Sequence, residues 1–140
     1  MYVLIGGGGL VGLSLSQKLL ELGHTVAVID IDPNACRYAR EKIGAMAFEG
    51  SAVSTEVLLE AGIRKANSLV AALRSDALNL AMVTLAKHYG VPHIISRMRH
   101  PDFAEPLRLA GVTIAKFSAS LLSAATKELA LRIPASNNTS

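Results

Sequence analysis

The chain has 140 residues, of which 51% are hydrophobic and 18% are charged, and its formal net charge is +3. This length and balance exclude a disordered chain and favour one domain with a buried core. Aromatic residues make up only 4% of the chain and basic residues are scattered along it, so we expect no nucleic-acid-binding surface.

The single cysteine and the short apolar runs bear on the compartment. Cys36 cannot form a disulfide within the chain, which favours a reducing compartment. The first apolar run stops at Ile5, too short for a signal peptide, and no run approaches the roughly 20 apolar residues of a membrane span. We therefore expect a cytoplasmic protein that does not insert into a membrane and reaches the inner face of one only through a partner.

Apolar, β-branched runs alternate with segments of helical periodicity along the chain, and glycines separate them. In chain order the expected elements are strand 2–5, helix 10–22, strand 25–29, helix 33–42, strand 45–48, helix 55–61, strand 68–73, helix 76–89, strand 93–96, helix 101–110, strand 112–115 and helix 119–132.

Six strands that alternate with six helices indicate an α/β fold. The arrangement predicts a Rossmann-type doubly wound parallel sheet with six strands in the order 3-2-1-4-5-6. The flavodoxin-like strand order is the main alternative. We expect the nucleotide-binding domain to span residues 1–133 and the polar residues 134–140 to form a frayed tail.

The glycine run after the first strand matches G-x-G-x-x-G at Gly7, Gly9 and Gly12. The match gains specificity because it follows a predicted strand and opens a predicted helix. Gly7 allows a tight turn, Gly9 lets a phosphate approach the backbone, and Gly12 lets the helix pack against the strand. The residues expected to bind phosphate are Gly7, Gly8, Gly9, Leu10, Val11 and Gly12.

Asp30 lies at the tip of the second strand, eighteen residues beyond Gly12. A carboxylate at this place accepts hydrogen bonds from ribose hydroxyls and repels a 2′-phosphate. We therefore expect NAD(H), or else ADP, AMP or ATP, and not NADP(H). Asp32 could share this role, but its position before Pro33 favours a helix cap.

Further candidate residues follow the other strands, because ligands of such folds bind at the carboxyl ends of the strands. This argument selects Gly50, Ser51, Ala72, Leu73, Arg74, Ser96 and Arg97. Arg74 and Arg97 could each contact a phosphate. The local cluster of Arg97, Arg99, His100 and Arg108 is either a solvated loop edge or a contact for an anion or a partner.

The sequence contains no catalytic constellation that we can assign. Tyr38 and Lys42 have the Tyr-x-x-x-Lys spacing of short-chain dehydrogenases, but they fall on the wrong helix, so we interpret the match as coincidence. The four histidines form no triad, and no metal-ligand spacing is present. We expect no enzymatic activity; an NAD-dependent oxidoreductase, or its cofactor domain, is the alternative.

The chain resembles the nucleotide-binding N-terminal domain of TrkA-type potassium uptake regulators, the RCK or KTN domains. The resemblance covers nearly all of residues 1–133. Its motifs are residues 5–12, 28–32, 50–52, 59–63, 79–80, 86–90 and 108–112. They add Ile31, Ala52 and Asn79 to the candidate site residues.

This resemblance implies a regulatory domain that binds NAD(H) or adenine nucleotides without turnover. It also implies a homodimer or larger ring on a membrane-embedded potassium channel or transporter, whose ion flux nucleotide binding would gate. Helix 119–132 is apolar on more than one face, which suits packing against a second copy.

Two residues depart from the family pattern. Leu10 stands where members often carry an arginine, and Ser51 where they usually carry aspartate or asparagine. The loop would then rely on backbone N–H groups and the helix dipole, so we expect a diphosphate ligand to suit it better than ATP.

Overall fold

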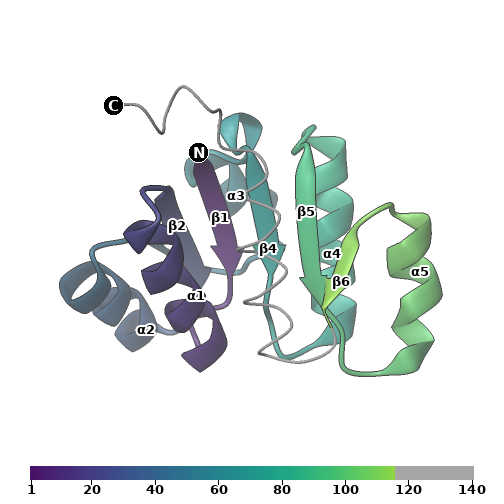
Figure 1. Cartoon of the computed structure of the whole chain (residues 1–140), viewed down its shortest axis with the longest axis horizontal. Coiled ribbons are helices and arrows are strands. Elements are labelled where there is room, and N and C mark those ends of the chain that lie inside the picture. Colours follow the sequence, from purple (N-terminus) through teal and green to yellow (C-terminus); the bar gives the residue numbers. More distant parts are fainter. Residues whose placement is uncertain (116–140) are drawn as a thin grey trace.

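The computed structural model describes residues 1–115. Within them six parallel strands form one sheet in the order β3-β2-β1-β4-β5-β6, which confirms the predicted Rossmann-type topology and excludes the flavodoxin-like order (Figure 1). The predicted helix 119–132, the tail 134–140 and the predicted domain end at residue 133 lie outside the described residues.

The sequence pattern predicted each strand and α-helix of this part of the chain to within a few residues. The strands are β1 (Tyr2–Gly6), β2 (Thr25–Asp30), β3 (Met46–Glu49), β4 (Ser68–Ala71), β5 (His93–Arg97) and β6 (Thr113–Ala115). The α-helices are α1 (Leu10–Glu21), α2 (Pro33–Tyr38), α3 (Thr55–Glu60), α4 (Asp76–His88) and α5 (Ala104–Leu109). Shorter helical turns are η1 (Ala39–Ile43), η2 (Ile63–Lys65) and η3 (Pro101–Phe103). The short turn η2 was not predicted.

Two boundaries differ from the expectation for physical reasons. The predicted strand 68–73 ends at Ala71. Beyond it, the backbone N–H and C=O of Leu73 form hydrogen bonds with the Asn79 side chain instead of with a neighbouring strand. The predicted helix 33–42 is α-helical only to Tyr38 and continues as the π-helical turn η1, which ends at Gly44 in the left-handed region.

Helices cover both faces of the sheet and bury two apolar layers (Figure 1). On one face Leu15 and Leu19 of α1 and Ala39 of η1 pack against alternate residues of the strands. On the other face α3, α4 and α5 supply Leu58, Met82, Val83, Ala86 and Leu107. This arrangement explains why the strands read as continuous apolar runs.

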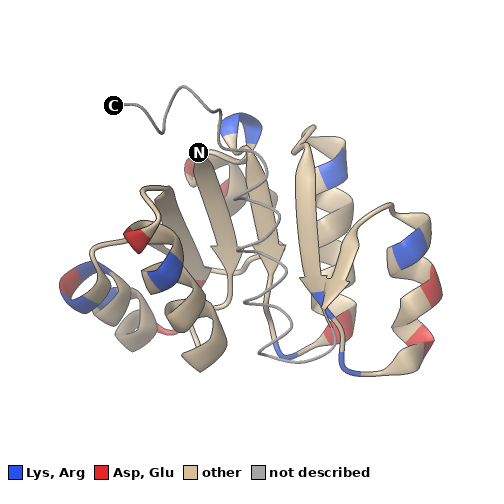
Figure 2. Ribbon diagram, in the orientation of Figure 1, with Lys and Arg blue, Asp and Glu red and all other residues tan. Residues whose placement is uncertain are grey.

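Formal charge in the strands is confined to their last residues. Asp30, Glu49 and Arg97 end β2, β3 and β5, and the other strand positions carry no Asp, Glu, Lys or Arg (Figure 2). All six strands are parallel, so these ends share one edge of the sheet. The fold thereby collects charge at its carboxyl edge.

The register aligns the functional positions across this edge. Gly6 pairs with Ile29 on β2 and with Ala71 on β4, and Ala71 pairs with Ser96 on β5. The next residue along each of these strands is Asp30, Gly7, Ala72 or Arg97. These four residues therefore form one row, in that order, with neighbouring strands about 4.8 Å apart.

The turn between β1 and α1 requires glycine at two positions. Gly7 has a φ of 110°, and a Cβ on it would lie 2.8 Å from the carbonyl oxygen of Ala72. A Cβ on Gly12 would lie 1.7 Å from the carbonyl oxygen of Gly7 and 3.6 Å from Ile5 Cγ2. The predicted packing of Gly12 against the strand is thus chiefly a contact with the turn itself.

Replacing Gly12 by alanine tests this packing. In an ordinary helix the change stabilises by about 1 kcal/mol, but here the methyl group would displace the turn and cost about 2 kcal/mol or more. Urea unfolding of Gly12→Ala measures the difference. Gly9→Ala is the matched control, because a Cβ there meets nothing within 4 Å, and it should change the free energy of unfolding by less than about 1 kcal/mol. Equal effects of the two variants would contradict the assignment.

Candidate functional site

A polar cleft of about 410 Å³ lies at the carboxyl edge, between the glycine turn and the ends of β4 and β5. Residues of both signs of charge line it, together with the turn. Its lining consists of Gly7, Gly8, Gly9, Leu10, Val11, Asp30, Ile31, Asp32, Ala35, Ala72, Leu73, Arg74 and Arg97.

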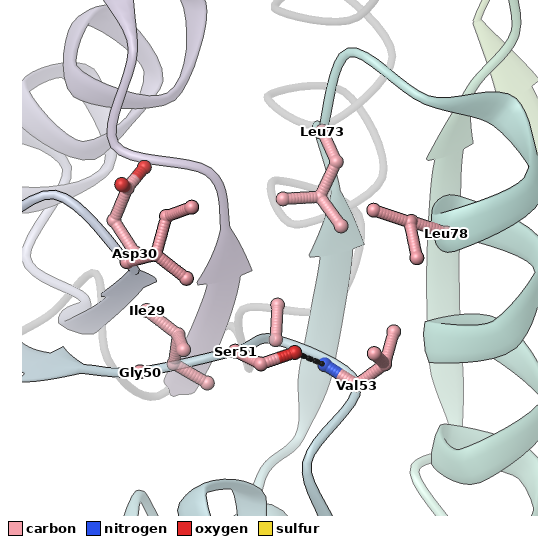
Figure 3. A pocket seen from close by; sticks show the side chains of 9 residues that line it. Ile29, Asp30, Gly50, Ser51, Val53, Leu73 and Leu78 are labelled. Carbon is pink, nitrogen blue, oxygen red and sulfur yellow. Dashed lines mark hydrogen bonds between the residues drawn. The ribbon is translucent and has the colours of Figure 1, made fainter.

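A second, mainly apolar pocket adjoins this cleft, and the two share Asp30, Ile31 and Leu73. Figure 3 shows Ile29 and Asp30 on one side, Leu73 and Leu78 on the other, and Gly50, Ser51 and Val53 along the base. Ala52 and Ile31 complete the lining. An apolar pocket joined to a polar cleft suits a ligand with a flat apolar end and a charged end.

The N-terminus of α1 faces the cleft without a side-chain cap. Its N-cap is Gly9 and its first turn holds no acidic residue. By contrast, Asp32, Ser54 and Ser75 cap α2, α3 and α4 through their side chains. The free N–H groups and partial positive charge of α1 are therefore available to an anion.

Asp30 joins the glycine turn to β2. One carboxylate oxygen accepts a hydrogen bond from the Gly8 N–H at 2.5 Å, and the other accepts one from the Asp32 N–H at 2.7 Å. A carboxylate offers about four acceptor sites, so both oxygens retain capacity for ribose hydroxyls. Asp32 itself accepts from the Asn34 N–H at 2.9 Å, which confirms its predicted role as a helix cap.

Asn79 holds the loop after β4 without lining either cavity. Its side chain is fully buried. Its Oδ1 accepts from the Leu73 N–H at 2.9 Å, and its Nδ2 donates to the carbonyl oxygens of Leu73 at 3.0 Å and Arg97 at 3.4 Å. Asn79 thus positions Leu73, which lines both cavities.

The predicted basic cluster divides into separate environments. Arg97 is half-buried and lines the cleft. Arg99 is exposed and its guanidinium donates to the carbonyl oxygen of Arg74 at 3.5 Å. His100 caps η3 and pairs with Asp102, while Arg108 pairs with Glu105. Only Arg97 of this cluster is directed to the cleft.

The structure therefore brings most of the predicted site residues together. Gly12 and Asn79 line neither cavity but contact residues that do, and Ser96 is fully buried. Sequence reasoning missed Ile29, Val53 and Leu78 of the apolar pocket and Ala35 of the cleft. The sequence could have indicated Leu78, because it is a large apolar side chain in the first turn of a helix at this edge.

Among the described residues that line the two cavities there is no histidine, cysteine, lysine or tyrosine. Cys36 lies behind Asp30, with its Sγ 3.5 Å from the Asp30 carbonyl oxygen. Burial raises the pKa of this thiol, and the Asp30 charge raises it further, which disfavours the thiolate.

Residues 1–115 contain neither a cluster of metal ligands nor a membrane-spanning helix. They contain no group of three or more histidine, cysteine, aspartate or glutamate side chains that could hold a metal ion. No helix among them has the length and apolar character needed to cross a membrane.

Comparison with known proteins gives a consistent family assignment. The model of the TrkA-N domain matches residues 3–116. A Trk system potassium uptake protein TrkA homolog from Methanothermobacter thermautotrophicus is 37% identical over 112 residues, which are 80% of this chain and 52% of the relative. The chain therefore spans about half the length of this curated relative.

Two solved structures with bound nucleotides share the fold. The Shewanella denitrificans Kef CTD in its AMP-bound form is 26% identical, with a TM-score of 0.73 over 98% of this chain and 85% of that one. The GsuK channel bound to NAD is also 26% identical, with a TM-score of 0.71 over 81% of this chain and 21% of the channel chain.

The contacts of Asn79 lead to a prediction about the loop that it holds. Asn79→Ala leaves the Leu73 N–H and C=O without their partners, which should cost about 2–3 kcal/mol of unfolding free energy. Hydrogen exchange at the Leu73 amide should accelerate in the same variant. Thr84→Ala, which removes an exposed hydroxyl from the same helix, should change stability by less than about 0.5 kcal/mol. Unchanged protection at Leu73 would show that the loop does not depend on Asn79.

Proposed function

This chain belongs to the TrkA-N domain family, and on that premise we propose that it is a nucleotide-binding regulatory domain of a potassium transport system. The observation that carries the proposal is the pair of adjoining cavities that meet at Asp30. An adenine base suits the apolar pocket, a ribose suits Asp30, and phosphates suit the uncapped N-terminus of α1.

The proposed ligand is NAD(H) or an adenine nucleotide such as ADP, AMP or ATP. The NAD-bound GsuK channel and the AMP-bound Kef domain support this choice, since both share the fold. Asp30 disfavours a 2′-phosphate, because its carboxylate would face a second negative charge. The cofactor-binding residues that we propose are those that line the two cavities, with Gly12 and Asn79 in supporting roles.

We further propose that binding occurs without turnover and is read by a partner. The partner would be a membrane-embedded potassium channel or transporter, and the domain would act on its cytoplasmic side as a homodimer or larger ring. Nucleotide binding can gate such a partner only if the two states of the assembly bind the nucleotide with different affinities. The names of the relatives, a potassium uptake protein and a channel, support this role.

Calorimetric titration with NADH, NAD⁺, ATP, ADP and AMP tests the nucleotide part of the proposal. We expect at least one of them to bind at submillimolar concentration, and we expect no substrate-dependent change in NADH absorbance. The absence of affinity for all five at millimolar concentration would overturn the proposed function.

Asp30→Ala, titrated with ADP and with 2′-deoxy-ADP, tests the ribose contact. The wild type should prefer ADP by about 1.5–3 kcal/mol, because hydrogen bonds to a charged acceptor have this strength. The variant should bind the two ligands about equally. Since Asp30 also holds Gly8, the comparison between ligands separates the ribose contact from any loosening of the turn. A preference for ADP that survives in Asp30→Ala would show that Asp30 does not contact the ribose.

Assembly is tested by analytical ultracentrifugation of the chain with and without nucleotide. We expect a dimer or larger species. A monomer under all conditions would overturn the assembly part of the proposal and leave nucleotide binding untouched.

A further inference from the structure

The polar cleft contains an arginine side chain that forms no ion pair with any residue between 1 and 115. Arg97 ends β5 and is half-buried. Among the described residues no hydrogen bond or salt bridge engages its guanidinium, whereas its carbonyl oxygen accepts from Asn79 and from Ser96. A half-buried guanidinium in an open cleft, with no protein partner among the described residues, keeps its donors available to an anion.

The strand register directs Arg97 to the face on which α1 lies. Side chains alternate along β5, and Ile95 belongs to the apolar layer that packs against α1. Arg97, two residues further, points to the same side and lines the cleft with the glycine turn. Arg74 lines the same cleft from the loop after β4 and is exposed.

The order of residues across the sheet orients the charge relative to the ribose site. Asp30 and Arg97 end β2 and β5, and Gly7 and Ala72 directly follow β1 and β4, which lie between them in the sheet. With strands about 4.8 Å apart, the Cα atoms of Asp30 and Arg97 are separated by about 14 Å. A ribose at Asp30 therefore places its first phosphate over the glycine turn, and only a longer phosphate chain extends towards Arg97.

On these grounds, and resting on the proposed nucleotide function, we propose that Arg97, assisted by Arg74, is the specificity-determining residue that makes the site prefer nucleotides with a second phosphate, such as ADP or NAD, over a monophosphate. The turn itself contributes no cation, because Leu10 at its tip is 85% exposed and uncharged. The first phosphate would be bound by backbone N–H groups, and the second by a guanidinium, whose planar donors suit phosphate oxygens.

Titration of the wild type and of Arg97→Gln with adenosine, AMP and ADP tests this inference. The wild type should bind ADP more tightly than AMP. Arg97→Gln should lose about 10- to 100-fold in affinity for ADP, the strength of a charged hydrogen bond, and much less for AMP and adenosine. Thermal unfolding of the variant checks that it folds as the wild type does.

Arg108→Gln is the matched control. It removes the same charge from a side chain that is exposed, pairs with Glu105 and lines neither cavity. It should alter ADP affinity by less than about threefold, since an exposed charge outside the cleft is screened by salt. Arg74→Gln should lie between the two variants.

The outcomes separate this inference from the proposed function. A wild type that binds none of the three ligands overturns the nucleotide function and this inference together. A wild type that binds them, while Arg97→Gln keeps the ADP-to-AMP ratio of affinities unchanged, overturns only the inference. An equal loss of ADP affinity in Arg97→Gln and in Arg108→Gln would also overturn it, because the effect would then follow from net charge alone.

Discussion

The site depends on the close approach of the first turn of α1 to the glycine turn before it. A Cβ on Gly12 would nearly coincide with the Gly7 carbonyl oxygen, and Gly7 adopts a φ that side chains rarely allow. This contact sets where α1 begins, and hence where its unpaired N–H groups point. It also brings the Gly8 N–H against Asp30, so that the phosphate-binding and ribose-binding elements are connected by one hydrogen bond.

The rest of the carboxyl edge is held by buried polar side chains whose partners are backbone groups. Asn79 bonds the loop after β4 and the end of β5. Asp76 accepts from the N–H groups of Arg99 and His100 at 2.8 and 2.7 Å, which ties the loop after β5 to α4. In these irregular segments the backbone groups have no neighbouring strand, and the side chains supply their hydrogen bonds instead. The same bonds hold Leu73 and Arg97 beside the cavities that they line.

The two cavities differ in chemistry because different layers of the fold build them. The apolar pocket opens between β2 and α4, where Ile29 and Leu78 extend the buried layer to the surface. The polar cleft opens on the face of α1, where the strands end in charged residues and the helix lacks a cap. A nucleotide combines an apolar base with a charged phosphate chain, and it matches this division.

The sequence by itself determined the element order, the topology and the core of the site. Periodicity and glycine positions suffice for these, because a parallel sheet buried on both faces demands continuous apolar strands, and a glycine turn before a helix has few conformations. Gly7, Asp30 and the residues after the strands could be located for the same reason. What only the tertiary structure decided is which of these side chains face a cavity. The Asn79 side chain bonds the carbonyl oxygen of Arg97, the Arg99 guanidinium donates to the carbonyl oxygen of Arg74, and Leu78 and Val53 line the apolar pocket. Such outcomes depend on distances between segments far apart in the chain, and no local pattern records those distances.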